Sequence, residues 1–360
     1  LSRGLGDVYK RQELISPETT VEAEKFLKEE IIKALNEREK KAVELASVFR
    51  VPFYSRALFI EDIDYDTIDK LVDKSLLQRS QNIYDLHELL RESIYNRLTP
   101  KQKNYYHIIA AEYYEKEKSD FAVIEAIYHY ILADNQDKAA RLAVENGSTI
   151  IKGGYLEEFM NVLAEFKSEK IQKEQYTKIL ISTGDISNLL GRWDDAINYY
   201  HASLELSSEI KNDLYTAEAH RGIAKIHLRR AEYDKTLHNL QTALAISDKV
   251  NDIYGVADAH YNIAFVKLRK GELNEALKEL ELGLELGQKI GDTALIAKLY
   301  GAMGVAYWSM GEYDKSIELM LKGMAELKEV GDRHELVKIY NNLGTAYEQK
   351  GEVGKAIEWY

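Results

Sequence analysis

The residues whose types and spacing come nearest to a metal site are "HELLR", at positions 87–91. They begin like the zinc-protease signature His-Glu-x-x-His, in which two histidines one helical turn apart bind the metal. Position 91 is arginine, so the second ligand is missing from that helix face. The chain also has no cysteine, which excludes thiolate metal sites and disulfides and fits a reducing cytoplasm. We therefore predict no metal site and a cytoplasmic location.

A second stretch, "GEVGKA" at 351–356, shares its Gly-Lys pair with phosphate-binding loops. It lacks the four-residue spacer between the glycines and the Ser or Thr that would bind Mg²⁺. No complete loop of this kind occurs elsewhere in the sequence, and no nucleophile is recognisably paired with a base. We therefore predict that the chain is not an enzyme, holds no cofactor and cannot hydrolyse ATP by itself.

A third stretch, "GEYDKSIELM" at 311–320, groups acidic residues with a lysine and a serine, but it belongs to a repeat. Related segments begin at 191, 231, 271, 311 and 351, with a constant period of 40 residues. The first residues of each segment are interpreted as a turn followed by the N-terminal end of a helix. Asp314 and Lys315 are therefore predicted to lie on a solvent-exposed helix face. His220 and His260 share one repeat phase and are interpreted as packing residues, not as a metal pair.

Small residues recur at fixed phases of this repeat, and bulky ones alternate with them. The small residues seven positions before each start are Gly184, Ala224, Ala264, Gly304 and Gly344. The bulky residues that follow each start are Tyr200, Leu240, Leu280, Met320 and Tyr360. Two helices approach closely only where one presents a small side chain and the other fills the gap. Each unit is therefore predicted to be a helical hairpin that buries its apolar face against its neighbours.

Two kinds of turn residue separate the predicted helices. Glycine at most of the starts is expected to end the first helix, because glycine adopts the left-handed conformation at little cost. The second turn carries in-phase Asx residues, which suit turns and helix N-caps, namely Asn212, Asp252, Asp292 and Asp332.

The composition favours an all-α fold. Only three prolines occur, and none follows Pro100, which indicates helix after helix with few rigid turns. The net charge of −12 disfavours wholesale binding to nucleic acid or to an anionic membrane, because both attract an excess of Lys and Arg. No apolar run approaches the ~20 residues that a membrane-spanning helix requires.

The repeat resembles the tetratricopeptide repeat (TPR), whose pattern is W-x₂-L-G-x₂-Y…A-x₃-F. "NNLGTAYEQKGEVGKA" (341–356) and "GAMGVAYWSMGEYDKS" (301–316) fit it closely. The resemblance covers 175–360 and implies a right-handed superhelix of helical hairpins, an α-solenoid. Residue 360 falls inside the second helix of the fifth repeat, so we expect the last repeat to be truncated. Residues 100–174 are predicted to form irregular helical hairpins, because segments such as "DNQDKA" at 134–139 break the repeat spacing.

The residues before position 100 do not follow the repeat pattern. The first twelve, "LSRGLGDVYKRQ", lack a starting Met and helical periodicity and are predicted to be non-native or adapter-derived. Residues 13–36 are predicted to form a linker helix, and 37–99 a small winged-helix domain of three helices with a hairpin before the last. Its second helix holds Asp64, Asp66, Asp69 and Asp73 against only Lys70 and Lys74, the opposite of what a phosphate-facing helix needs. DNA binding by this element is therefore not expected.

"ALNEREKKAVELASVFRVP", "LVDKSLLQRS" and "LHELLRE" resemble the winged helix that follows the nucleotide-binding domain in STAND (NB-ARC-like) signal-transduction ATPases. Those proteins often continue into TPR-like superhelices. The resemblance implies that "LHELLRE" corresponds to the Met-His-Asp motif, so His87 would reach the β-phosphate of ADP bound in a nucleotide-binding domain that this chain lacks. Glu88 and Leu86 depart from that motif, which puts the strength of the contact in doubt. A histidine satisfied locally at a helix start is the alternative for His87.

We therefore predict a protein- or peptide-binding sensor of a STAND-type ATPase, with an upstream nucleotide-binding domain as partner and ATP or ADP bound only there. A free-standing TPR adaptor and a winged-helix transcription regulator remain alternatives. The repeat phase places a set of first-helix residues on the concave wall, where they are predicted to bind an extended acidic peptide or protein tail: Arg221, Lys225, Tyr261, Asn262, Phe265, Lys298, Trp308, Lys338, Asn341 and Asn342. Ordinary exposed helix residues are the alternative interpretation of this set.

Overall fold

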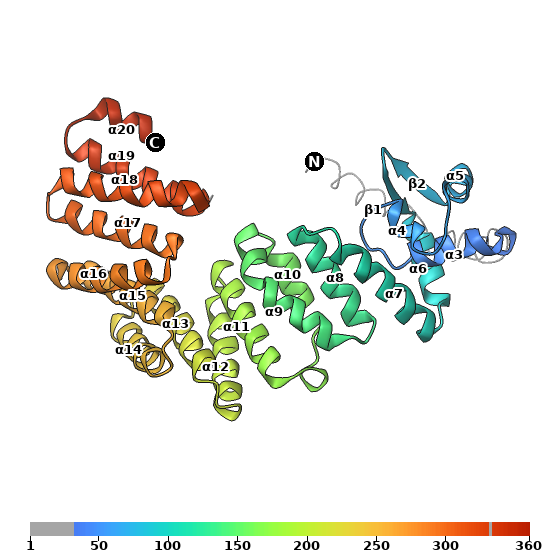
Figure 1. The fold of residues 1–360 in the computed structure, drawn as a ribbon, viewed down its shortest axis with the longest axis horizontal. Helices are drawn as coiled ribbons and strands as arrows, with labels where there is room; N and C mark the ends of the chain where they lie inside the picture. The colour runs from blue at the N-terminus through green and yellow to red at the C-terminus, as the bar shows by residue number, and fades with distance from the viewer. Residues whose placement is uncertain (1–31, 331–332) are drawn as a thin grey trace, which may run out of the picture. The chain divides into compact units, whose positions relative to one another are not determined.

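The computed structural model describes residues 32–330 and 333–360 (Figure 1). These residues are mostly helical, with one small three-stranded sheet, which confirms the predicted all-α solenoid class. The chain divides into two compact units, Leu1–Ile171 and Gln172–Tyr360. Residues 1–12 and nearly all of the predicted linker helix lie outside the described residues. Of that linker, Ile32–Ala34 forms a 3-10 turn, η3. No helix in the described part is long and apolar enough to cross a membrane.

The first unit opens with a small module of helices and strands. Its elements in chain order are α3 (Glu37–Ala46), β1 (Phe53–Tyr54), α4 (Arg56–Phe59), α5 (Tyr65–Asp73), β2 (Leu77–Ser80), β3 (Ile83–Leu86) and α6 (Glu88–Arg97). The strands form an antiparallel sheet in the order β1-β3-β2. The predicted capped helix, hairpin and final helix are all present, whereas α4 and β1 were not predicted. This arrangement is consistent with a winged-helix-like domain.

Local signals in the sequence explain these elements. The Asp64 side chain caps α5 by accepting a hydrogen bond from the Thr67 backbone N–H at 2.8 Å. Asn36 and Glu39 form a reciprocal capping box at the start of α3. The core of the module is built from fully buried apolar side chains, the largest being Tyr84, Phe49, Phe53, Leu45, Leu58, Ile63, Ile68, Leu71 and Leu77.

The remainder of the first unit consists of helices that follow one another in pairs. They are α7 (Pro100–Glu115), α8 (Asp120–Leu132), α9 (Gln136–Gly153) and α10 (Leu156–Leu163), followed by the short turn η4 (Ser168–Lys170). Arg50, just after α3, binds Glu125 of α8 through two nitrogens at 2.7–3.1 Å. This ion pair, in which the Glu125 side chain is buried and the Arg50 side chain is partly exposed, links the sheet-containing module to the helical pairs.

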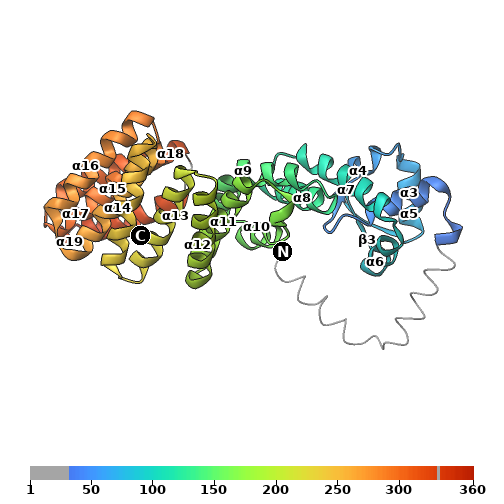
Figure 2. The same cartoon turned by 90° about the horizontal axis from the view of Figure 1, so that it is seen from below.

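The second unit is a stack of helical hairpins with the predicted period of 40 residues. Its helices are α11 (Lys173–Leu189), α12 (Trp193–Glu209), α13 (Asp213–Arg229), α14 (Tyr233–Lys249), α15 (Ile253–Lys270), α16 (Leu273–Ile290), α17 (Thr293–Ser309), α18 (Tyr313–Val330), α19 (Arg333–Gln349) and α20 (Val353–Trp359). Figure 2 shows the same succession of hairpins from a second direction.

The predicted turn chemistry is confirmed at the turns given below, whereas Asp332, the fourth predicted Asx residue, lies outside the described residues. Gly191, Gly271 and Gly311 have φ between 76° and 79° after the first helix of their hairpins, and Ala231 adopts the same conformation (φ 57°) without the advantage of glycine. At the second turn the side chains of Asn212, Asp252 and Asp292 each accept a hydrogen bond from the third helical N–H.

The small-to-bulky pairing is confirmed where the small residue is glycine. A Cβ on Gly184 would lie 2.8 Å from the Tyr200 ring, and one on Gly222 would lie 2.3 Å from the same ring. A Cβ on Gly304 would lie 2.7 Å from Met320. Tyr200 is therefore held between the first helices of two successive hairpins, which could not approach so closely with larger residues.

The first helices α11, α13, α15 and α17 each contact the first helix of the next hairpin directly, and the last of these contacts is with α19. They consequently form the inner wall of the second unit, and the second helices pack outside them. This wall carries the candidate site.

Candidate ligand-binding groove

The inner wall is lined by two sets of residues that repeat every 40 positions. The first set, near the start of each first helix, is Lys178, Glu218, Asp258, Lys298 and Lys338. The second set, two turns further along each helix, is Asp185, Lys225, Phe265, Val305 and Thr345. Charged residues thus dominate the wall formed by α11, α13 and α15, and apolar or uncharged residues enter from α15 onward.

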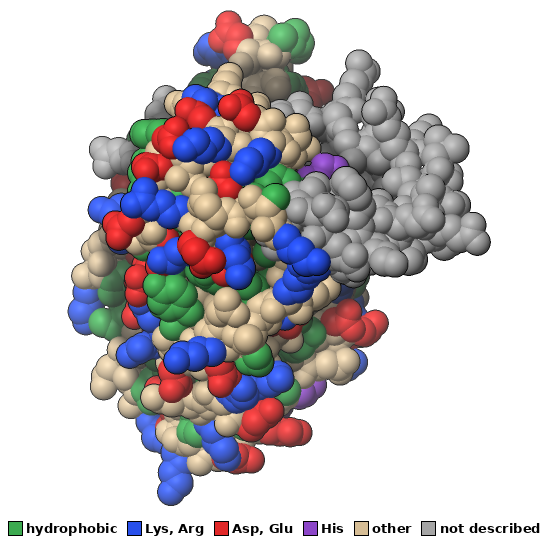
Figure 3. Space-filling model, turned by 90° about the vertical axis from the view of Figure 1, so that its right-hand side faces the viewer, with side chains coloured by type: hydrophobic (Ala, Val, Ile, Leu, Met, Phe, Trp, Pro, Cys, Tyr) green, Lys and Arg blue, Asp and Glu red, His purple; other side chains and the backbone are tan. Residues whose placement is uncertain are grey.

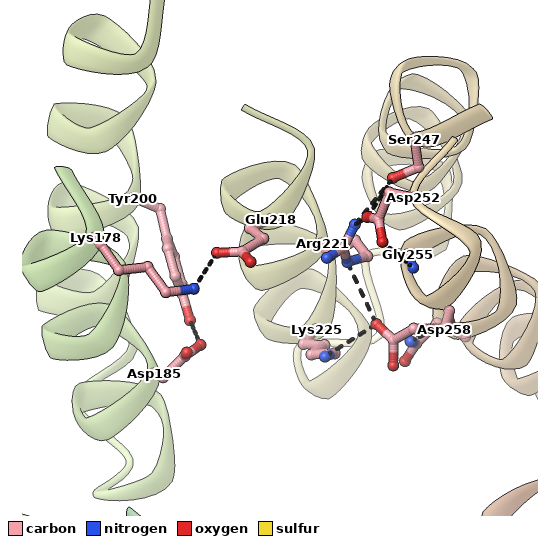
Figure 4. A network of polar contacts seen from close by, with 11 residues as sticks. Lys178, Asp185, Tyr200, Glu218, Arg221, Lys225, Ser247, Asp252, Gly255 and Asp258 are labelled. Carbon is pink, nitrogen blue, oxygen red and sulfur yellow. Dashed lines mark hydrogen bonds and ion pairs between the residues drawn. The ribbon is translucent and has the colours of Figure 1, made fainter. Parts of the chain in front are cut away.

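In the N-terminal half of the wall, charges are paired between hairpins (Figure 4). Lys178 Nζ of α11 donates to Glu218 Oε2 of α13 at 2.5 Å. The Tyr200 hydroxyl donates to Asp185 Oδ1 at 2.6 Å. Burial raises the pKa of the Asp185 carboxyl, although the Tyr200 hydrogen bond acts in the opposite direction.

Arg221 of α13 contacts one residue of its own hairpin and two residues of the next hairpin. Its Nη1 donates to Ser247 Oγ at 3.1 Å and to Asp252 Oδ2 at 3.3 Å, and its Nε lies 3.6 Å from Asp258 Oδ2 (Figure 4). Asp252 also accepts from the Gly255 backbone N–H at 2.9 Å. Arg221 is therefore committed to structural contacts that link α13 to the turn before α15.

Lys225 and Asp258 form the next link of this network. Lys225 Nζ lies 3.2 Å from Asp258 Oδ2, and the Asp258 charge raises the pKa of Lys225 against the effect of burial. Burial alone would raise the pKa of Asp258, but the charges of Lys225 and Arg221 outweigh it and the net change is downward. Both groups are consequently charged at neutral pH, and each compensates the other.

Two of the predicted groove residues are not available to a ligand. Arg221 is only 6% exposed, and Asn262 only 5%. The Asn262 amide nitrogen donates to the Asp258 backbone carbonyl at 2.7 Å within its own helix. The prediction of a free Arg221 charge and a free Asn262 amide is therefore wrong, because neighbouring elements bury both groups and internal partners satisfy them.

The wall changes character between α15 and α17. Tyr261 and Phe265 are half-buried, with ring centroids 6.0 Å apart. Lys298 of α17 is also half-buried, and its Nζ makes no hydrogen bond or ion pair within the described residues. Its charge contributes to lowering the pKa of Asp258 only from a distance.

A pocket of about 150 Å³ lies in the wall between α17 and α19. It is lined by Val305, Trp308, Met320, Asn342 and Thr345, and we call it the Trp308 pocket. The indole Nε1 of Trp308 is buried without a hydrogen-bond partner in the described structure. The half-buried Asn342 amide likewise makes no hydrogen bond to any described residue.

The Trp308 pocket unites two predicted groove residues, Trp308 and Asn342, with three that sequence reasoning missed. Val305 and Thr345 share the repeat phase of Lys225 and Phe265, which was the available signal for them. Met320 was recognised only as a bulky packing residue. Two further predicted groove residues, Lys338 and Asn341, are exposed on α19 and do not line the pocket.

The histidines singled out in the sequence occupy separate places. His87 is exposed at the N-cap position of α6, and its side chain makes no capping hydrogen bond. His220 Nδ1 is paired with Asn239 Oδ1 at 2.9 Å, and His260 Nδ1 with Glu279 Oε2 at 2.6 Å. Each of these two contacts joins the helices of one hairpin, as expected of packing residues.

The charged residues of α5 in the first unit are largely paired. Asp66 binds Lys70, Asp69 binds Arg79 and Asp64 binds Arg38, at 2.5–3.3 Å. On the face drawn in Figure 3, basic and acidic side chains are interspersed and do not form one field of a single sign. This distribution offers little to a polyanion such as DNA.

Comparisons with known proteins agree with this architecture. The model of the tetratricopeptide repeat matches residues 179–249, 255–325 and 295–360. No curated protein matches the sequence. Among solved structures, a signal transduction ATPase with numerous domains (STAND) protein with a tetratricopeptide repeat sensor, from Pyrococcus horikoshii, is 22% identical with a TM-score of 0.67.

The alignment with the Pyrococcus protein covers 93% of this chain and 51% of that one, so the chain spans about half of its length. Apo RapI is 17% identical with a TM-score of 0.55, over 72% of this chain and 95% of that one. A Rap protein complexed with competence and sporulation factor is 17% identical with a TM-score of 0.54, over 72% and 74% of the two chains. These likenesses concern the fold, and together with the family match they show that residues 179–249 and 255–360 are tetratricopeptide repeats.

Proposed function

We propose that the chain is a protein- or peptide-binding sensor module, and that an extended acidic segment is its ligand. The observation that carries the proposal is the contrast within the inner wall. The cations of the N-terminal half have internal partners, whereas Lys298, Asn342 and the Trp308 indole N–H have none among the described residues. Polar groups left unsatisfied in a concave wall favour the binding of a ligand that satisfies them.

We further propose that the module belongs to a STAND-type ATPase in the cytoplasm. The order of a winged-helix-like domain, irregular helical pairs and regular repeats supports this context, as does the structural likeness over 93% of the chain. ATP or ADP would then bind to an upstream nucleotide-binding domain, and this chain would hold no cofactor and carry out no catalysis. The exposed His87 at the start of α6 would meet the β-phosphate through a charge-assisted hydrogen bond.

A free-standing TPR adaptor is the second candidate. The observation that favours it is the likeness to Rap proteins, one of which was solved in complex with competence and sporulation factor and is matched over 72% of this chain. Upstream coding sequence separates the two candidates, because a Walker A motif within about 300 residues would identify the ATPase. A winged-helix transcription regulator ranks below both because the charges of α5 are already paired.

Selection from a random peptide library on the immobilised chain tests the binding function. We expect saturable one-to-one binding of the selected peptides in calorimetry, weakened by added salt because carboxylates meet lysines. A scrambled peptide of the same composition is the control. Failure to select any peptide or protein segment that binds more tightly than its scrambled control would contradict the proposal.

A further inference from the structure

We infer that only the C-terminal half of the inner wall binds ligand, and that it recognises two features of an extended peptide. One apolar side chain enters the Trp308 pocket, and one carboxylate lies at Lys298. The inference rests on the proposed function and specifies which part of the wall is used and which peptide residues are read.

The N-terminal half is excluded because its charges already compensate one another. Lys178 is paired with Glu218, and Lys225 with Asp258, at 2.5 Å and 3.2 Å. A ligand carboxylate there would meet the acidic partner of each lysine and would have to displace it. Displacing Glu218 or Asp258, whose side chains are 23% and 11% exposed, would leave a mostly buried carboxylate uncompensated, which is unfavourable.

The Trp308 pocket has the size and lining for one apolar side chain. Its volume of about 150 Å³ equals that of an engineered apolar cavity that binds benzene. Val305, Met320 and the Trp308 ring supply apolar walls, whereas the Asn342 amide has no hydrogen-bond partner in the described part of the chain and can both donate and accept. An amide pairs with a peptide backbone whatever its sequence, so Asn342 would hold the chain while the pocket reads the side chain.

Lys298 adds the second feature. It lies near the start of α17 and Trp308 lies near its end, ten residues apart. Ten helical residues span about 15 Å. An extended peptide covers this distance in about four or five residues. The ligand is therefore expected to carry Asp or Glu about four or five positions from a Leu, Ile, Met or Phe.

The probe for this inference is a random 12-residue phage-displayed library, selected on the full chain. A synthetic fluorescein-labelled peptide of the resulting consensus is then measured by anisotropy. The consensus is expected to show the acidic–apolar spacing given above. Replacing its acidic residue by the amide, or its apolar residue by Ser, should weaken binding about tenfold or more.

Three variants of the chain are paired with matched controls. Thr345→Trp fills the pocket, and its control Thr242→Trp changes a threonine on the outer helix α14 that makes the same hydrogen bond to the backbone carbonyl four residues earlier. Asn342→Ala is matched by Asn262→Ala, at the same repeat phase.

The third pair reverses a charge. Lys298→Glu is matched by Lys278→Glu, at an exposed lysine on the outer helix α16. We expect each test variant to weaken binding about tenfold and each control to stay within about twofold. Circular dichroism is used to check that every variant is folded. If a pocket variant unfolds, Lys298→Glu still tests the inference, because it changes only a half-buried side chain.

The outcomes separate this inference from the proposed function. Selected peptides that bind all test variants as tightly as the parent chain would overturn the inference while leaving peptide binding intact. The same holds if binding is lost on Lys178→Ala or Lys225→Ala but not on Lys298→Glu. If the library yields no peptide that binds the parent chain, both the inference and the proposed function fail.

Discussion

Acidification is expected to destabilise the first unit before the repeats, because two histidines are buried against each other between α7 and α8. His107 Nδ1 lies 2.8 Å from His129 Nδ1, and the Tyr95 hydroxyl lies 3.0 Å from His107 Nε2. The Tyr114 ring stacks on His129 with an interplanar angle of 9°. His129 Nε2 has no hydrogen-bond partner in the described structure. The hydrogen bond between the two Nδ1 atoms requires at least one neutral ring, because both atoms would be donors if both rings were protonated.

The direction and size of the effect follow from the pKa of His107. Burial, aided by the charge of Lys103, lowers this pKa from 6.5 to about 4, and burial also lowers that of His129. The unfolded chain therefore binds more protons than the folded chain as the pH falls from 6.5 toward 4. One pKa unit corresponds to about 1.4 kcal/mol, so His107 alone accounts for a loss of about 2 kcal/mol by pH 5 and about 3 kcal/mol in total.

The placement of the tryptophans makes this measurable in the intact chain. All three, Trp193, Trp308 and Trp359, lie in the second unit, so tryptophan fluorescence reports on the repeats alone. Far-ultraviolet circular dichroism reports on both units. Between pH 7 and pH 5 we expect the transition seen only by circular dichroism to fall by roughly 4–8 °C. Ion-paired carboxylates of the repeats, such as Asp258, lose their contribution only below about pH 4, because their pKa lies below the usual 3.8.

A variant without the titrating pair provides the control. His107→Gln combined with His129→Phe should lower stability at pH 7 but flatten its dependence on pH between 6.5 and 4.5. His201→Gln, at an exposed position on α12, should leave the pH dependence unchanged. An equal pH dependence in the double variant and the parent chain would refute the reasoning.

Four further predictions concern packing, charge and function. Gly222→Ala should lower the free energy of unfolding, measured with urea, by about 1–3 kcal/mol, because the new Cβ would lie 2.3 Å from the Tyr200 ring. Gly354→Ala, whose Cβ would meet no atom within 4 Å, should leave this free energy unchanged, and equal effects of the two changes would contradict the packing argument. Arg221→Met should lower the free energy of unfolding by about 3 kcal/mol, because Asp252 would lose its ion pair and Asp258 would keep only Lys225; a loss below about 1 kcal/mol would contradict this. Random duplex DNA at low salt should show no anisotropy change below about 10 µM chain, so submicromolar, salt-dependent binding would be the contrary result. In a protein that includes the nucleotide-binding domain, His87→Ala should speed ADP release and raise basal activity, and unchanged release rates would exclude the proposed contact.

The sequence predicted the hairpins well because their boundaries are set locally. Gly271 and Asp252 act within their own turn, so repeat phase alone locates the helix ends. The contact between Gly184 and Tyr200 could also be predicted, because a small residue and a bulky residue recur at these two phases of the repeat.

The burial and partners of the inner-wall residues could not be predicted from the repeat phase, because they depend on side chains from other hairpins. Asn262 and Asn342 share a phase, yet the first is buried and the second lines a pocket. Arg221 was predicted to be a free charge, but its carboxylate partners Asp252 and Asp258 lie 31 and 37 positions away in the next hairpin. Repeat phase gives the direction of a side chain but not the identity of the group it meets.

The ion pairs between hairpins also have a consequence for cooperativity. In a stacked array, the free energy of each interface determines how far one hairpin can open without its neighbour. The links described here between Lys178 and Glu218, and between Lys225 and Asp258, strengthen the interfaces from α11 to α15. A peptide spanning α17 and α19 would strengthen the interface between those two hairpins, so ligand binding would raise the cooperativity of the C-terminal hairpins. Slower hydrogen exchange in α19 would then report occupancy of the groove.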